Sequence, residues 1–333
     1  MKATKPTPEK FNLDNILTTF ATDENARAFL ESWLWPDGPV CPRCKGSNPD
    51  RIYKMTGKST RPGLHNCKDC RRQFTVTVGT IFEDTHLPLR KWIIGLFLMA
   101  SSKKGMSSLQ FMRILGIGSY RTALYMTDRI RFALHEGTFE SKLSGTVEID
   151  ECYFGPKAKR GPGIHKNKVA VIGMVERQTG QRRSFVRKHP SINEVTKLVD
   201  ENIEDGTTIN TDESGLYARL PSWYFHHTVC HQPKGANNFK GEYYRMEEDG
   251  SIVTTNFVES SFSLLRRGVI GTFHNLSNKY LPLYVAEFDH RFNHRKLTDG
   301  ERMITMLQKT KGKRTTLKSL KGEARDDKDS KSQ

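Results

Sequence analysis

The order of apolar and polar positions predicts strands and then helices between residues 50 and 134. Residues 72–78 alternate between polar and apolar side chains, and residues 50–54, with Ile52 and Tyr53 at their centre, are interpreted as a second strand. Apolar residues then recur at helical spacing, which predicts helices over 89–100, 107–115 and 120–134, with a glycine turn before the last. Helix, glycine turn, helix is the outline of a helix-turn-helix.

Beyond residue 145 the pattern changes to alternating strands and helices. Strands are predicted over 146–150, 168–175, 183–187 and 208–212, with a helix over 192–202 before the fourth strand. Further apolar segments follow, and a helix begins near residue 256. The order strand, strand, strand, helix, strand, helix, strand, helix matches a ribonuclease-H-like α/β domain, a mixed sheet flanked by helices. In that arrangement the first and fourth strands lie side by side.

Length and charge limit the class of protein. A chain of 333 residues is long enough for several domains. Lys and Arg number 53 against 37 Asp and Glu, and the formal charge of +16 favours a polyanionic partner such as nucleic acid. The sequence has neither a run of eighteen apolar residues nor an apolar secretory signal, so we expect a soluble intracellular protein that does not bind membranes.

Four of the six cysteines form two close pairs, Cys41 with Cys44 and Cys67 with Cys70. Two such Cys-x-x-Cys turns can supply the four thiolates of a tetrahedral structural Zn²⁺ site, and the flanking strands favour a β zinc ribbon. The alternative is two unrelated pairs of reduced cysteines. A closed four-cysteine shell leaves no open position for catalysis. His65 is interpreted as a surface residue.

Two aspartates close predicted strands that should be neighbours. Asp150 ends the first strand and Asp212 ends the fourth. Carboxylates about 4 Å apart repel by about 4 kcal/mol at an effective dielectric of 20, so cations are expected between them. Mg²⁺, or Mn²⁺ in its place, suits oxygen ligands, and two ions can catalyse in-line phosphoryl transfer. Three adjacent carboxylates are interpreted as solvated or paired groups beside the site: Glu148, Glu151 and Glu213.

The third metal ligand has two candidates on the helix that begins near residue 256. Asn256 and Glu259 lie three positions apart, hence on one helical face, which continues to Arg266. The opposite stripe is apolar, so the polar face can point towards a phosphate. The alternative is a capping box, in which Asn256 caps the helix and Glu259 occupies its third position.

Two basic segments are predicted to contact DNA. One is the helix over 120–134, which presents arginines among apolar residues as a helix along a DNA groove would. The other is the loop over 156–168, with an ordinary solvated loop as the alternative. The predicted DNA-binding residues are Arg121, Arg129, Arg131, Lys157, Lys159, Arg160, Lys166 and Lys168.

The group of His226, His227, Cys230 and His231 fits a strand with alternate faces better than a second zinc site, and His231 is a secondary candidate for the catalytic site. Residues 310–333 are almost free of apolar side chains and are predicted to form a disordered basic tail.

These segments closely resemble the DDE transposases of zinc-ribbon bacterial insertion sequences, the group related to the eukaryotic Merlin transposons. The resemblance covers nearly the whole chain before the tail. The matching stretches are 41–44, 67–76, 79–84, 147–155, 211–213, 255–259, 263–268, 271–274 and 292–293.

The resemblance implies a catalytic domain that cuts transposon ends and transfers the freed 3′-hydroxyl to target DNA without a covalent enzyme intermediate. It also implies Asp150 and Asp212 as metal ligands with an acidic residue or Asn in third place, so Asn256 and Glu259 both stay open. Where the family has Lys this chain has Arg266, which keeps the charge. Cys152 and Cys230 stand where Thr-like and Asn residues are expected.

Two other functions compete with a transposase. One is a catalytically silent or domesticated transposase that acts as a sequence-specific DNA-binding regulator, and the other is a nuclease acting on RNA or hybrids. The intact set of acidic residues argues against a silent transposase. The predicted zinc ribbon and helix-turn-helix favour duplex DNA as the substrate over RNA or hybrids. We expect a homodimer or a higher synaptic assembly on double-stranded DNA, in the cytoplasm and associated with the nucleoid.

The predicted domain order follows from these segments. It comprises a helical lead over 1–35, a zinc ribbon over 36–82, a helix-turn-helix segment over 86–136, the ribonuclease-H-like domain over 143–300 and the tail over 310–333.

Overall fold

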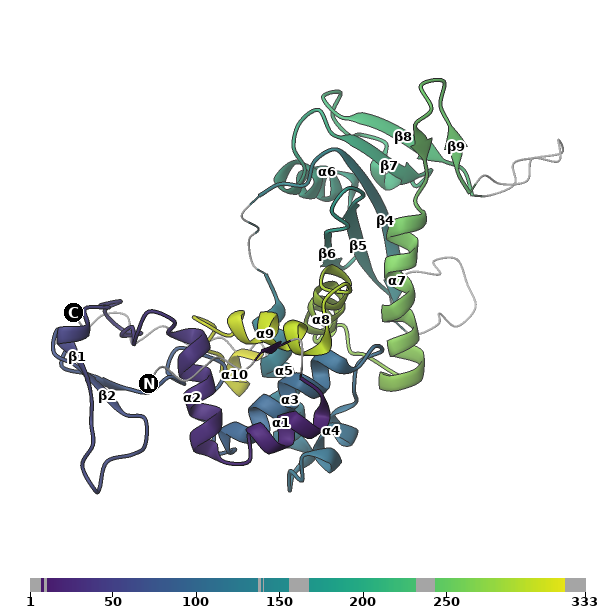
Figure 1. Ribbon diagram of the computed structural model, residues 1–333. Helices are drawn as coiled ribbons and strands as arrows, with labels where there is room; N and C mark the ends of the chain where they lie inside the picture. Colours follow the sequence, from purple (N-terminus) through teal and green to yellow (C-terminus); the bar gives the residue numbers. More distant parts are fainter. Residues whose placement is uncertain are drawn as a thin grey trace. The chain divides into compact units, whose positions relative to one another are not determined.

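The computed structural model describes residues 7–8, 11–136, 139, 141–155, 168–231 and 243–320. These residues form two compact units (Figure 1). The first unit combines the chain up to Leu134 with the chain from Lys296 onward, and the second is His135–Arg295. Over the described ranges, no helix has the length and apolar character needed to cross a membrane.

The amino-terminal part of the first unit joins two helices to a small antiparallel sheet. Asn12 and Thr22 cap the two helices through their side chains, as Asn and Thr commonly do at this position. The sheet has the order β1-β2-β3, and its strands are shorter than predicted. These elements are α1 (Leu13–Thr19), α2 (Asp23–Leu34), β1 (Ile52–Lys54), β2 (His65–Cys67) and β3 (Gln73–Phe74).

The rest of the first unit is helical. The helices α3 (Leu89–Ser101), α4 (Ser108–Ile114) and α5 (Tyr120–Leu134) have nearly the bounds that the periodicity predicts. Eight residues of α3 are buried, and α9 (Asp299–Gln308) packs against this helix. The chain therefore returns to the first unit after Arg295, which composition alone does not indicate.

Part of the predicted tail is packed against this unit. Thr310 and Thr315 are buried, and the backbone carbonyl of Thr315 accepts a hydrogen bond from Tyr125 Oη at 3.3 Å. Lys313 Nζ donates to the carbonyl of Ala133 at 2.8 Å, and Arg314 pairs with Glu83 at 3.1 Å. The expectation of disorder is wrong for residues 310–320, which end in α10 (Leu317–Leu320), because polar contacts replace the missing apolar burial. Residues 321–333 lie outside the described part.

A five-stranded mixed sheet with the order β6-β5-β4-β7-β8 forms the centre of the second unit. The strand β4 pairs with β5 antiparallel and with β7 parallel, so the first and fourth strands are neighbours as predicted. This is the ribonuclease-H-like arrangement. A short 3₁₀ turn, Gly215–Tyr217, stands where the strand order predicted a helix. The strands are β4 (Thr146–Phe154), β5 (Val169–Glu176), β6 (Arg182–Arg187), β7 (Thr208–Asp212) and β8 (Phe225–Val229).

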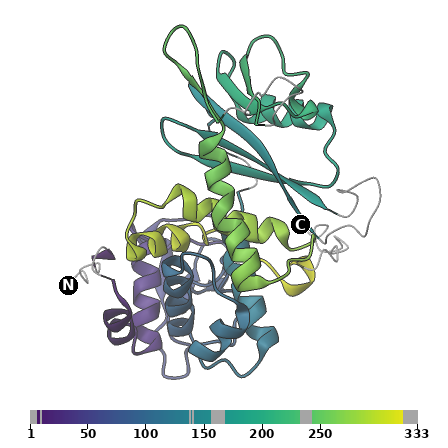
Figure 2. The ribbon, with the colours of Figure 1, turned by 90° about the vertical axis from the view of Figure 1, so that its right-hand side faces the viewer.

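Helices cover both faces of this sheet (Figures 1 and 2). On one face α6 (Ile192–Asn202) packs its Val195 and Val199 against the odd-numbered side chains of β4. On the other face lie α7 (Asn256–Gly268) and α8 (Leu281–Asn293). Even-numbered side chains of β4 and β7 point to this second face, because neighbouring side chains alternate along a strand.

The glycine opposite Asp150 in the sheet lets α7 lie close to it. Gly173 of β5 pairs with Asp150 of β4, and a Cβ atom at this glycine would stand 2.8 Å from the ring of Phe262 in α7. Any larger side chain would therefore push the helix away from the strand that carries the aspartate. Two further elements stand beside α7 in sequence: the hairpin of β9 (Arg245–Met246) and β10 (Ile252–Val253) before it, and the π-helical turn Val269–Phe273 after it.

Candidate functional site

Asp150 and Asp212 lie on neighbouring parallel strands. Asp212 ends β7, whereas β4 continues beyond Asp150 to Phe154, so the prediction that Asp150 ends its strand is wrong. Thr146 pairs with Thr208, and both aspartates follow four positions later, so they are level with each other across the two strands. Both are even-numbered and belong to the face covered by α7. The structure thus brings together the two residues that the sequence predicted to meet.

A third carboxylate, Glu151, joins this pair. Suitable oxygens of Asp150, Glu151 and Asp212 all lie within 4.8 Å of one another. Glu151 accepts hydrogen bonds from Ser214 Oγ at 3.0 Å and from Tyr217 Oη at 2.6 Å. The sequence analysis interpreted Glu151 as a solvated or paired carboxylate beside the site. Its place next to Asp150 in the sequence was the signal that could have identified it.

The electrostatics of this cluster favour bound cations. Burial raises the pKa of Asp150 to about 7, and the negative charges of Glu151 and Asp212 act in the same direction. Burial also raises the pKa of Asp212, and Glu259 adds a further negative charge, while the N–H of Ser214 acts in the opposite direction. Crowded, partly buried carboxylates resist ionisation unless cations neutralise them. Three carboxylates with oxygen donors fit hard divalent ions such as Mg²⁺.

The first turn of α7 holds both candidates for the third ligand. Asn256 is the first residue of the helix and Glu259 lies one turn further, and both are exposed. The capping box suggested as the alternative is absent, because the N-cap residue is Thr255 and its side chain does not cap the helix. Thr255 Oγ1 instead donates to Glu259 Oε1 at 2.8 Å, and His231 Nε2 lies 3.0 Å from the same oxygen.

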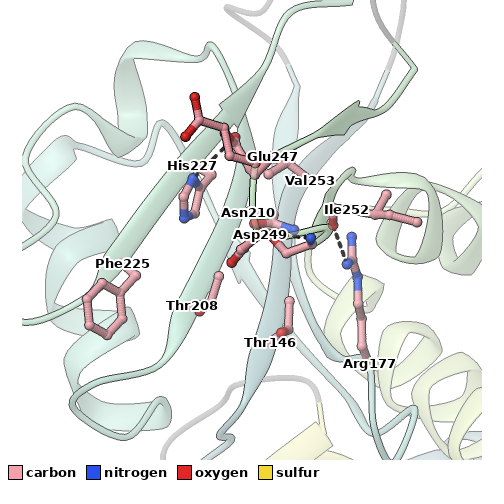
Figure 3. A pocket seen from close by; sticks show the side chains of 12 residues that line it. Thr146, Arg177, Thr208, Asn210, Phe225, His227, Glu247, Asp249, Ile252 and Val253 are labelled. Atoms are coloured by element: carbon pink, nitrogen blue, oxygen red, sulfur yellow. Dashed lines mark hydrogen bonds and ion pairs between the residues drawn. The ribbon is translucent and has the colours of Figure 1, made fainter.

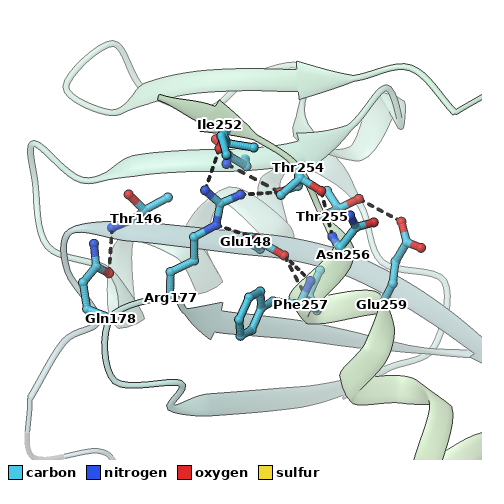
Figure 4. A network of polar contacts seen from close by, with 12 residues as sticks. Thr146, Glu148, Arg177, Gln178, Ile252, Thr254, Thr255, Asn256, Phe257 and Glu259 are labelled. Atoms are coloured by element: carbon cyan, nitrogen blue, oxygen red, sulfur yellow. Dashed lines mark hydrogen bonds and ion pairs between the residues drawn. The ribbon is translucent and has the colours of Figure 1, made fainter. Parts of the chain in front are cut away.

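Glu148 is paired rather than solvated. Its side chain is fully buried, and Arg177 Nε lies 2.6 Å from Glu148 Oε1. Its other carboxylate oxygen accepts hydrogen bonds from two backbone N–H groups at the start of α7 (Figure 4). Glu148 therefore joins the strand of Asp150 to the helix of Glu259.

Of the predicted DNA-binding cations of the second unit, only Lys168 lies in the described part, where it is half-buried just before β5. Lys157, Lys159, Arg160 and Lys166 lie outside the described residues. Arg266 is exposed on α7, and its Nε donates to Cys152 Sγ at 3.0 Å. Cys152 is two positions beyond Asp150 on the same face of β4, which brings the Arg266 charge near the carboxylates.

The four cysteines of the amino-terminal sheet gather as predicted. Cys41 Sγ lies 3.6 Å from Cys70 Sγ, and Cys44 Sγ lies 3.6 Å from Cys67 Sγ. A tetrahedral Zn²⁺ with bonds of about 2.3 Å requires sulfurs roughly 3.8 Å apart, so this cluster fits the ion. His65 is buried between Trp35 and Phe74, which corrects its interpretation as a surface residue.

Two of the predicted DNA-contacting arginines are buried. Arg129 donates to the carbonyl of Glu83 at 2.5 Å and stacks on Trp92, and Arg131 pairs with Asp128 at 3.1 Å. The prediction that Arg129 and Arg131 contact DNA is therefore wrong, because both side chains are used in the helical core. Arg121, at the amino end of α5, is exposed.

A cavity of about 540 Å³ lies at the opposite end of the strands from the carboxylates (Figure 3). Thr146, Thr208 and Phe225, the first residues of β4, β7 and β8, line it together with residues of the β9–β10 hairpin. Asp150 and Asp212 do not line this cavity, so the cavity does not mark the candidate reaction centre.

Comparison with known proteins identifies both regions. Residues 142–293 match the family described as ISXO2-like transposase domain, and residues 21–73 match the transposase zinc-ribbon domain. The first match contains Asp150, Asp212 and Glu259, and the second contains all four clustered cysteines.

One relative and one solved structure complete the comparison. An uncharacterized protein in transposable element ISH50 of Halobacterium salinarum is 25% identical over 314 residues, which cover 88% of this chain and 98% of the relative. A chain in the simian T-cell lymphotropic virus intasome, solved with PP2A regulatory subunit B56 gamma, is 14% identical. The match covers 58% of this chain and 66% of that chain, just under two thirds, and its TM-score of 0.26 is too low to support an argument.

Proposed function

The chain belongs to the DDE transposases that carry a zinc ribbon, and on this premise we propose that it cleaves and joins DNA at the ends of an insertion sequence. The observation that carries the proposal is that Asp150 and Asp212 lie level with each other on adjacent parallel strands. Glu151 lies with them, and an α-helix bearing a further carboxylate covers the same face.

In this proposal, Asp150 and Asp212 hold two divalent ions, Mg²⁺ or Mn²⁺. Such ions, when bound, activate a water or a 3′-hydroxyl and stabilise the leaving oxygen of an in-line displacement. Glu151 is held by Ser214 and Tyr217 and adds negative charge beside the two aspartates. The protein contributes carboxylates of fixed geometry. Burial raises the pKa values of Asp150 and Asp212, and bound cations would lower them again by favouring the ionised form.

We assign the third ligand to Glu259 in preference to Asn256. The Glu259 charge contributes to the raised pKa values of both Asp150 and Asp212, which supports this assignment. Carboxylates that ligate metals usually accept hydrogen bonds from neighbouring groups, and Thr255 and His231 are placed to donate them to Glu259 here. His231 is then a positioning residue, and Asn256 is left to contact a phosphate.

The proposed partner is double-stranded DNA, both the element ends and the target. Lys168 and Arg266 lie in the catalytic unit, and Arg121 is exposed in the helical unit, so each can meet a phosphate. Two element ends must be held together for joining, which calls for a homodimer or a larger synaptic assembly. The proposed location is the cytoplasm, in association with the nucleoid.

The test incubates the protein with Mg²⁺ and oligonucleotides copied from the flanks of its gene. We expect cleavage at the 3′ end and joining to a second duplex, both lost in Asp150→Asn. Asp205→Asn is the matched control, because Asp205 is an exposed carboxylate of the same unit. Specific binding without cutting by the parent protein would contradict the proposal and favour a DNA-binding regulator.

A further inference from the structure

Glu148 is a fully buried carboxylate on the same strand and face as Asp150, two positions before it. Its Oε2 accepts hydrogen bonds from the backbone N–H groups of Phe257 at 2.8 Å and Val258 at 3.1 Å. Its Oε1 accepts from Arg177 Nε at 2.6 Å. Both oxygens of one carboxylate are thus engaged by groups outside its own strand (Figure 4).

Arg177 extends this connection to the segment that leads into α7. It follows β5 directly, and its Nη1 donates to the carbonyl of Ile252 at 2.5 Å. Its Nη2 donates to the carbonyl of Thr254 at 3.1 Å. A guanidinium presents its donors in a rigid planar fork, so one side chain fixes Glu148 and two backbone carbonyls together.

The start of α7 depends on this carboxylate. The N-cap residue, Thr255, makes no capping hydrogen bond with its side chain, whereas Asn12, Thr22, Ser191 and Thr298 cap their helices in the usual way. Glu148 takes the place of the missing cap from a neighbouring strand. A negative charge at a helix amino end is favourable, and hydrogen bonds to an ionised carboxylate are stronger than neutral ones.

This geometry connects Asp150 to the helix that carries Glu259. Glu148 and Asp150 are held by one strand, and Glu259 lies on the same helical turn as the two amides that Glu148 binds. A change in those hydrogen bonds would move Glu259 relative to Asp150. We infer that Glu148 and Arg177 are positioning residues for the metal-binding carboxylates, an inference that rests on the proposed function.

An ion pair within a single helix has a different geometry, and the same unit contains one. Glu287 and Arg291 lie one turn apart on α8, both buried, with Arg291 Nη2 2.5 Å from Glu287 Oε1. This pair joins two residues of a single helix, whereas the pair of Glu148 and Arg177 joins β4 to the start of α7. Glu287→Gln is therefore the matched control for Glu148→Gln.

The experiment measures Mn²⁺ affinity by titration in parallel with hydrogen exchange of residues 252–260. For Glu148→Gln and Arg177→Gln we expect the Kd for Mn²⁺ to rise by roughly 10- to 100-fold, the usual effect of losing a residue that orients a metal ligand. Backbone amides of 252–260 should also exchange faster. Glu287→Gln should lower the melting temperature and leave both the Mn²⁺ affinity and the exchange of 252–260 at the parental values.

The possible failures are distinguishable. Parental Mn²⁺ affinity in Glu148→Gln, beside a parent that binds the ion, would overturn the positioning role alone. A parent that binds no Mn²⁺ would contradict the proposed function and this role with it. If Glu148→Gln does not fold, Arg177→Lys is measured instead, because it keeps the charge near Glu148 and loses the fork. Weakened Mn²⁺ binding in that variant supports the inference, and parental binding overturns it.

Discussion

The four-cysteine cluster and the carboxylate cluster are opposite kinds of candidate metal site. The sulfurs lie in two pairs 3.6 Å apart and suffice to enclose one ion. The carboxylates of Asp150, Glu151 and Asp212 gather within 4.8 Å, but burial and mutual repulsion raise their pKa values. The four thiolates can form a closed shell around one ion by themselves, whereas bound cations would relieve the repulsion among the carboxylates.

The comparison also separates stability from activity. A structural zinc site contributes directly to folding, so its ligands should be indispensable to the ribbon. Buried carboxylates of like charge oppose folding, and proteins retain such groups where function needs them. Substitutions in the two clusters should therefore have opposite effects on stability.

Loss of zinc should have the largest effect on folding. Cys67→Ser removes one of the four thiolates, and structural zinc binding is typically worth about 10–16 kcal/mol. We expect the zinc content to fall from one ion to none and residues 41–74 to lose their protection from hydrogen exchange.

The control for this variant is Cys230→Ser, since Cys230 is outside the four-cysteine cluster. It should keep one zinc ion and a protected ribbon. Zinc retained by Cys67→Ser with an intact ribbon would show that the cluster is not a structural zinc site.

Loss of a central aspartate should have the largest effect on catalysis. Asp212→Asn should weaken binding of the divalent ions. Because such ions stabilise the transition state by several kcal/mol, the cleavage rate should fall by about 10³-fold or more. The zinc content and the folded state should not change. Rates of single-turnover cleavage, with Asp205→Asn as the exposed control, measure this effect. A fall of less than tenfold would remove Asp212 from the reaction centre.

The two third-ligand candidates should differ in their effect. Glu259→Gln should slow cleavage by about 10²-fold, because an amide binds a divalent ion more weakly than a carboxylate does. Asn256→Ala should cost only about tenfold, as expected for a lost phosphate contact of about 1.4 kcal/mol. The neighbouring exposed Ser260 provides the control, Ser260→Ala. The reverse order of these losses would assign the metal to Asn256.

The strain in the carboxylate cluster predicts a pH-dependent stability. The pKa of Asp150 is about 7 in the folded protein against an ordinary 3.8, so the folded state holds this proton more tightly. Without metal, the free energy of unfolding should therefore fall as pH rises from about 4 to about 7. Asp150→Asn should equal the parent at pH 4 and melt at a higher temperature than the parent at pH 8, where Asp150 is ionised in the folded parent.

Melting curves at both pH values, with and without Mg²⁺, test this expectation. Mg²⁺ should stabilise the parent at pH 8 and leave Asp150→Asn almost unchanged, because ligand binding stabilises only the form that binds. An Asp150→Asn protein that is no more stable than the parent at pH 8 would show that the cluster is not strained.

The smallest effect is expected at the exposed arginine of α5. Arg121→Gln should weaken DNA binding a few-fold and reduce the slope of the logarithm of affinity against the logarithm of salt concentration by about 0.9, the value of one phosphate contact. Binding measured over a range of salt concentrations tests this. A parental slope in Arg121→Gln would mean that this end of α5 does not contact DNA.

Local patterns in the sequence predicted the features that depend on near neighbours. The paired cysteines, the helices over 89–134 and the strand order that makes Asp150 and Asp212 neighbours all follow from spacing and periodicity. Features that depend on distant partners were missed. The buried Arg129 donates a hydrogen bond to the carbonyl of Glu83, 46 residues earlier in the chain. Residues 310–320 contact Tyr125 and Ala133, about 180 residues earlier.

The capping of α7 shows why such partners escape sequence analysis. Asn256 and Glu259 have the spacing of a capping box, yet Glu148, more than a hundred residues away, binds the amides at this helix start. The sequence around residue 256 could not reveal that partner, because Glu148 lies on β4, more than a hundred residues earlier in the chain. The composition of the strand around Glu148 also gives no sign of Arg177.

The most direct test of the contrast between the two sites is anomalous scattering from a crystal soaked in Mn²⁺. We expect a zinc signal among Cys41, Cys44, Cys67 and Cys70, and a manganese signal between Asp150 and Asp212 with no zinc there. Manganese bound elsewhere, with none between the two aspartates, would contradict the assignment of this site as the reaction centre.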